Sequence, residues 1–122
     1  MINIDVQKTY ATVVGAVLVL IGLLGFVPNP LVGATDALFG ANAVQSVVHL
    51  LGGAVGLWLG MKGSAKNFNL GLGVVAVLLA VLGFVPATAA MLTTLLAVNQ
   101  NITFLHAGIA VVSLGVAFGV KE

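Results

Sequence analysis

Two histidines are the residues of this sequence best placed to do chemistry. His49 and His106 lie inside apolar stretches, and each follows an asparagine by seven residues. An imidazole can ligate haem iron or chlorophyll magnesium, and two imidazoles at equal depth would suit a bis-histidine haem. The structural alternative is a hydrogen bond from each imidazole to a neighbour such as Gln45 or Thr103, because a polar group inside a membrane needs a partner. His49 and His106 are therefore candidate cofactor-binding residues, although the fold requires neither haem nor chlorophyll.

The rest of the sequence offers no catalytic set. It has no cysteine for thiolate, zinc or iron–sulfur chemistry. Its carboxylates, Asp5, Asp36 and Glu122, lie outside the apolar stretches, so they provide no buried acid–base pair. Ser46 is close to His49 in the sequence, but no acidic residue is available to orient the imidazole. We therefore predict that the protein is not an enzyme and has no dedicated metal site.

Membrane helices must position the histidines, because the chain is too apolar for a soluble domain. Of its 122 residues, 61% are hydrophobic and 6% are charged, whereas a soluble domain has roughly 25% charged residues. Its 4 basic residues form no patch, which excludes nucleic-acid binding. The composition predicts one integral membrane domain over residues 1–122, in contact with lipid.

Four uncharged stretches of 18 or 19 residues lie at 10–27, 43–61, 68–85 and 102–120. As helices they would each reach roughly 27–29 Å, close to a hydrocarbon core of about 30 Å. Backbone polar groups in lipid must be bonded internally, and helices achieve this. The predicted fold class is therefore all-α, an integral membrane four-helix bundle.

The two connections without Lys or Arg, 28–42 and 86–101, are each expected to contain a short interfacial helix. In the first, Asn29 would cap a helix that opens at Pro30; in the second, Thr88 would cap a helix over 89–98. The lysines lie on the opposite side, at Lys8, Lys62, Lys66 and Lys121. This charge difference predicts cytoplasmic termini in a bacterial inner membrane or an internal membrane derived from it.

The sequence also indicates an internal repeat. The string LGFVP occurs at 24–28 and 82–86, an offset of 58, and the two histidines are offset by 57. We therefore expect two tandem two-helix repeats, at about 10–61 and 68–120. Repeats that insert with the same orientation are related by a pseudo-two-fold axis along the membrane normal.

Small residues recur along the predicted helices at spacings near one turn. Such stripes let helix backbones approach closely, either within one bundle or against another membrane subunit. The residues expected at helix contacts are Gly15, Gly22, Gly52, Gly53, Gly56, Gly60, Gly73, Gly83, Ala110, Ser113 and Ala117.

Three segments together match the pattern of one known family. They are VVGAVLVLIGLLGFVP at 13–28, VHLLGGAVGL at 48–57, and the LH pair of Leu105 and His106. In these segments, and over nearly the whole sequence, the chain resembles a family of small bacterial four-helix membrane proteins, the domain of unknown function 4383. The resemblance implies the four-helix architecture and leaves the activity open.

From these features we expect a non-catalytic accessory or scaffold subunit that packs against another membrane protein or a second copy of itself. Low charge, the absence of a catalytic set and the abundance of small residues all favour this role. The alternatives are a haem- or chlorophyll-binding protein that uses His49 and His106, and a small-solute channel.

Overall fold

The computed structural model describes residues 5–34 and 37–119, so Asp36, Lys121 and Glu122 lie outside the described part. In chain order its elements are α1 (Val6–Leu24), β1 (Val32–Gly33), β2 (Phe39–Gly40), α2 (Ala43–Lys62), α3 (Ala65–Phe84), α4 (Pro86–Leu96) and α5 (Gln100–Gly119). Helices α1, α2, α3 and α5 are long and apolar enough to cross a membrane. This confirms the predicted all-α membrane bundle.

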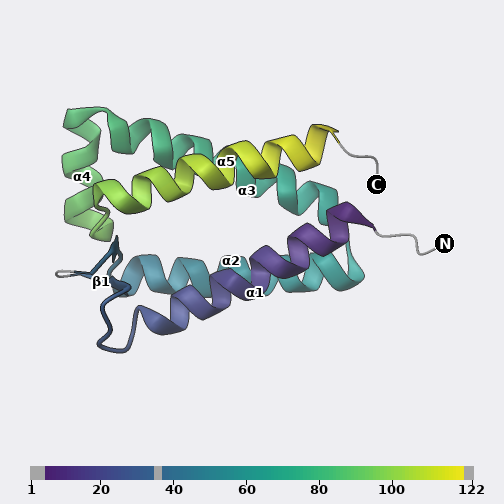
Figure 1. Ribbon diagram of the computed structural model, residues 1–122, viewed down its shortest axis with the longest axis horizontal. Coiled ribbons are helices and arrows are strands. Elements are labelled where there is room, and N and C mark those ends of the chain that lie inside the picture. Colours follow the sequence, from purple (N-terminus) through teal and green to yellow (C-terminus); the bar gives the residue numbers. More distant parts are fainter. Residues whose placement is uncertain (1–4, 35–36, 120–122) are drawn as a thin grey trace.

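The four long helices form two hairpins that lie side by side (Figure 1). Helix α1 packs along α2, and α3 packs along α5; contacts between the hairpins are fewer and run mainly through α3. The start of α1, the α2–α3 connection and the end of α5 lie at one end of the bundle, and α4 and the strands lie at the other (Figure 1). We call these the lysine end and the loop end. The predicted duplication of one hairpin stays a prediction.

Polar caps extend the helices beyond the apolar stretches. Helix α1 begins at Val6 instead of residue 10, because the Asp5 carboxylate accepts a hydrogen bond of 3.1 Å from the Lys8 backbone nitrogen. Helix α3 begins at Ala65 instead of residue 68, with Ser64 as its cap. Capping side chains satisfy backbone groups at a helix start, so the helices begin earlier than an apolar count indicates.

The prediction of a helix that opens at Pro30 after Asn29 is wrong. The described part of this loop contains the two short parallel strands β1 and β2 instead. The Asn29 side chain accepts hydrogen bonds from the backbone nitrogens of Leu31 and Val32, at 2.9 and 2.8 Å. It also donates to the carbonyl of Leu24 at 2.7 Å. Asn29 therefore closes a turn against the end of α1, and no helix begins at Pro30.

The second loop does contain a helix, but its predicted boundaries are wrong. Helix α4 begins at Pro86 and ends at Leu96. Its start at Pro86 is favourable because proline is well suited to the first helical position. Thr88 is not the cap; its hydroxyl donates to the carbonyls of Leu82 and Val85, at 2.6 and 3.2 Å. Figure 1 shows α4 lying across the end of the bundle.

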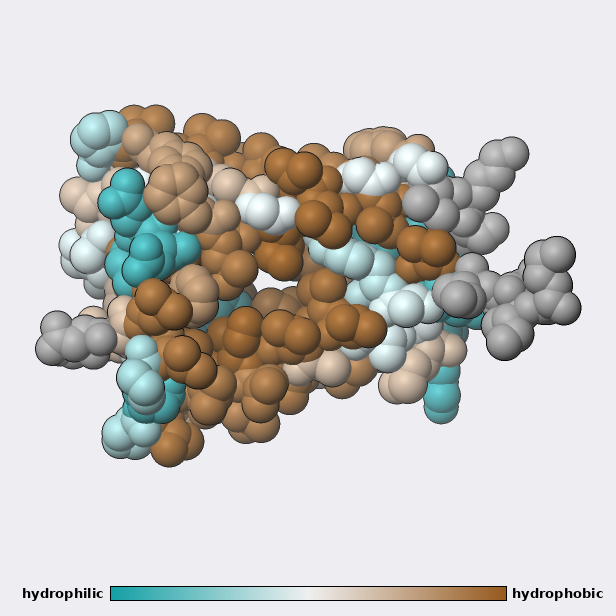
Figure 2. Space-filling model, viewed as in Figure 1, coloured by the Kyte–Doolittle hydropathy of each residue, from teal (hydrophilic) through white to brown (hydrophobic). Residues whose placement is uncertain are grey.

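On the face shown in Figure 2, an apolar belt lies between two more hydrophilic ends. The buried hydrophobic residues are mostly small, and they include Ala11, Ala65, Ala76, Ala110 and Ala117. Large apolar side chains lie on the outside, as expected for a surface that contacts lipid. The interior is therefore held together by close backbone approach and a few polar contacts.

Candidate functional site

The interface between the two hairpins, which we call the seam, is closed by polar contacts at the lysine end. The Gln7 amide donates to the Val116 carbonyl at 2.7 Å, and the Asn69 amide donates to Gln7 Oε1 at 2.9 Å. The hydroxyls of Tyr10 and Ser113 are 2.6 Å apart and form a hydrogen bond. These contacts join α1 to both α3 and α5.

A second set of polar contacts closes the seam at the loop end. The Gln45 amide donates to the carbonyls of Leu96 and Gly40, at 2.8 and 3.1 Å. One turn earlier, the Asn42 side chain donates to the Leu95 carbonyl at 2.9 Å. The start of α2 is thereby fixed to the end of α4, so the hairpins are tied together at both ends.

The two histidines lie between these polar ends. His49 is one turn after Gln45 on α2, and His106 is two turns before Ser113 on α5, so each shares the helix face that meets the other hairpin. The two side chains are close enough to interact electrostatically. The structure therefore brings together two residues that are 57 positions apart in the sequence.

Both imidazoles lack the neighbours expected to hold them. The Nδ1 atoms of His49 and His106 are buried and have no hydrogen-bond partner among the described residues. The Gln45 amide is directed at backbone carbonyls, and the Thr103 hydroxyl donates to the Asn99 carbonyl at 3.0 Å. Neither expected neighbour is bonded to a histidine, so both imidazoles have unused hydrogen-bonding capacity.

The seam also contains a hollow. Figure 2 shows a hollow about midway along the seam, between α1 and α5. Gly52 lies one turn after His49, and a Cβ atom there would meet only Leu18 Cδ1, at 4.0 Å. The contact of Gly52 with α1 is therefore looser than the backbone contact that its neighbour Gly53 makes.

The other small residues of α1 and α2 lie in close backbone contact. A Cβ atom at Gly53 would lie 2.6 Å from the Gly15 carbonyl oxygen, and one at Gly15 would lie 2.7 Å from the Leu57 nitrogen. A Cβ atom at Gly22 would lie 2.8 Å from the Ser46 carbonyl oxygen, and one at Gly60 would lie 2.9 Å from the Thr12 backbone nitrogen. Glycine at these positions is what permits the helices to approach so closely.

In the second hairpin, side chains fill more of the contact. A Cβ atom at Gly73 would lie 2.6 Å from Leu114 Cδ2, and one at Gly83 would lie 2.5 Å from Thr103 Oγ1. Gly56 contacts the Phe68 ring across the seam. Ala110, Ser113 and Ala117 are buried along α5.

One exposed face of α5 was not anticipated as a separate surface. Gly108, Gly115 and Gly119 have no atom within 4 Å of a Cβ position. At 100° per residue they fall within about 40° of one another around the helix. Val111 and Phe118, next to this glycine face, are 74% and 73% exposed. The glycine spacings of seven and four were a signal available in the sequence.

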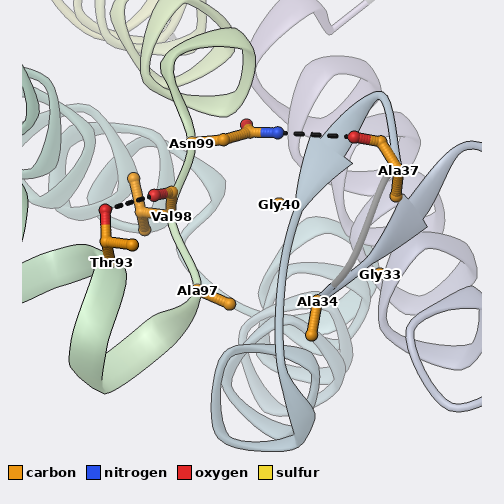
Figure 3. A pocket seen from close by; sticks show the side chains of 8 residues that line it. All are labelled: Gly33, Ala34, Ala37, Gly40, Thr93, Ala97, Val98 and Asn99. Carbon is orange, nitrogen blue, oxygen red and sulfur yellow. Dashed lines mark hydrogen bonds between the residues drawn. The ribbon is translucent and has the colours of Figure 1, made fainter.

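A pocket of about 310 Å³ lies at the loop end, between the strand loop and the α4–α5 connection (Figure 3). Its polar side chains already have partners. The Thr93 hydroxyl donates to the Val98 carbonyl at 2.8 Å, and the Asn99 amide donates to the Ala37 carbonyl at 3.4 Å. No sequence pattern indicated this pocket, because it forms from segments that are distant in the chain.

In the described ranges no group of three His, Cys, Asp or Glu residues could hold a metal ion. The chain has no arginine, and the described lysines, Lys8, Lys62 and Lys66, lie at or next to the lysine end, so none is near the histidines to pair with a haem propionate.

Comparison with known proteins identifies the family. A family model described as "Domain of unknown function (DUF4383)" matches residues 8–119, nearly the whole chain. No curated protein and no solved structure matches.

Proposed function

The chain belongs to the DUF4383 family, a family of unknown function, and we propose that it is a non-catalytic accessory or scaffold subunit of a larger membrane assembly. The exposed glycine face of α5 carries this proposal. Its partner is another membrane protein or a second copy of this chain, in addition to lipid.

Glycine within a helix is less favourable than alanine by about 0.8–1.0 kcal/mol, so several glycines on one face call for a reason. At Gly15 and Gly53 the reason is internal, because backbone atoms of the paired helix occupy the space. At Gly108, Gly115 and Gly119 nothing in the described chain occupies it. A helix from another subunit could approach the α5 backbone there, with Val111 and Phe118 packing along one side of it.

The lysines favour one orientation for this subunit. Lys8, Lys62 and Lys66 all lie at or next to the lysine end, and the described part of the loop end has no basic residue. The positive-inside rule then directs the lysine end, with both termini, to the cytoplasm of a bacterial inner membrane or a membrane derived from it.

Native mass in a mild detergent tests the proposal. We expect the wild-type chain to run in an assembly larger than its own 12.3 kDa. Gly108→Leu and Gly115→Leu should release it from that assembly, because each side chain would block a partner helix. Gly71→Leu is the matched control: Gly71 is equally open but lies on α3. A wild-type monomer, or equal behaviour of all three variants, would contradict the proposal.

The channel alternative gains no specific observation. Its candidate polar residues contact different parts of the chain: Gln45 bonds to backbone carbonyls, Ser46 packs against Gly25, and Ser113 bonds to Tyr10. Solute flux into proteoliposomes should therefore not exceed that of empty vesicles.

A further inference from the structure

We propose that His49 and His106 form a binding site for a neutral molecule dissolved in the lipid, with two hydrogen-bond-accepting carbonyl groups on opposite edges of a ring, as in a quinone head group. The site is separate from the glycine face of α5, and the proposal does not depend on the docking function of that face.

Unused hydrogen-bonding capacity is the first reason. A neutral imidazole has one donor and one acceptor nitrogen. Both Nδ1 atoms are buried without a partner in the described structure, and neither imidazole takes part in any other hydrogen bond there. A buried polar group without a partner is unfavourable, so two imidazoles without one in the same seam favour a ligand that bonds to both.

The shape of the seam is the second reason. Polar contacts hold the hairpins together at Gln45 and Leu96 on one side of the histidines and at Tyr10 and Ser113 on the other. Between these contacts the seam is hollowed, and the hollow opens toward the apolar belt (Figure 2). A ligand would therefore enter from the lipid. Gly52, one turn after His49, packs loosely, because a Cβ atom there would meet only Leu18 Cδ1, at 4.0 Å.

Charge selects the chemical class. Asp5 and Lys8 are at the lysine end, and no charged residue in the described ranges lies at the level of the histidines. An ion bound there would lose its hydration without gaining a counter-charge, which is very unfavourable in a medium of low dielectric constant. A neutral dicarbonyl ring avoids this cost. Since the imidazoles come from opposite hairpins, each can donate to one carbonyl.

Nitrogen NMR of the histidines tests the site directly, because the chain has only 2 histidines. The full chain, labelled with ¹⁵N at histidine and held in detergent micelles, is titrated with decylubiquinone. We expect the imidazole signals of both residues to shift together and to saturate. Gly52→Leu should abolish both shifts by placing a large side chain one turn from His49. Gly71→Leu should preserve them, because Gly71 is an exposed glycine of α3 with no atom within 4 Å of its Cβ position.

A second variant keeps the test decisive if Gly52→Leu does not fold. In His49→Leu the quinone-induced shift of His106 should require about tenfold more quinone, the effect of losing one hydrogen bond. The proposal is overturned if neither imidazole responds in the wild type, if only one does, or if Gly52→Leu responds like the wild type. A haem or chlorophyll absorbance band in the purified protein that is lost in His49→Leu would also overturn it, in favour of a metal-centred cofactor.

Discussion

Two adjacent glycines on α2 allow the close contact between α1 and α2 to be measured. In Gly53→Ala the new Cβ atom would lie 2.6 Å from both the Gly15 carbonyl oxygen and the Val19 nitrogen. These are backbone atoms, so α1 and α2 must move apart. In Gly52→Ala the nearest atom is Leu18 Cδ1 at 4.0 Å, an ordinary van der Waals distance.

Both substitutions replace glycine by alanine in the same helix, so their effects on helix propensity cancel in the comparison. The remaining difference is the cost of overpacking, typically about 1–3 kcal/mol. We therefore expect Gly53→Ala to be less stable than Gly52→Ala by about this amount. A greater loss is expected if the separation also weakens the contact between Gly56 and Gly15, which lies one turn further along.

Unfolding in mixed micelles with a rising fraction of SDS measures the difference, with circular dichroism and the fluorescence of Trp58, the single tryptophan, as two signals. Coincident transitions would support a two-state comparison. If both variants unfold at the same SDS fraction, the backbones of α1 and α2 do not approach as closely as the structure shows. The explanation that glycine is needed there for close helix contact would then be wrong as well.

Three further predictions concern the seam, the strand loop and the orientation. Tyr10→Phe and Ser113→Ala should show a coupling free energy of about 1 kcal/mol in a double-mutant cycle, because the two side chains share one hydrogen bond between the hairpins. Additive effects of the two substitutions would mean that this bond does not join the hairpins. Asn29→Ala should speed hydrogen exchange at the amides of Leu31 and Val32, which its side chain holds, while exchange in the middle of α2 serves as the control; unchanged exchange at the two amides would contradict the turn. The chain has no cysteine, so Gln100→Cys should react with a membrane-impermeant maleimide on intact cells and Asn67→Cys only after lysis; the reverse pattern would refute cytoplasmic termini.

Sequence alone determined the number and approximate place of the membrane helices, because the thickness of the hydrocarbon core fixes the length of an uncharged span. The helix ends were less accurate. At α1 and α3 they depend on the capping groups Asp5 and Ser64, which lie outside the apolar stretches. The strand loop was missed for a related reason: Asn29 can cap a helix or close a turn, and bonds to the end of α1 decide between them.

The tertiary structure decided which small residues lie in helix contacts and what the histidines face. Gly52 and Gly53 are equivalent in a sequence pattern, yet a step of about 100° around the helix separates a loose contact from a backbone contact. The sequence placed His49 and His106 at matching positions of two hairpins, but their proximity depends on how the hairpins are joined. Polar contacts at both ends of the seam fix that arrangement and leave the imidazoles between them without partners. A sequence pattern does not show these contacts, because they connect residues up to 109 positions apart.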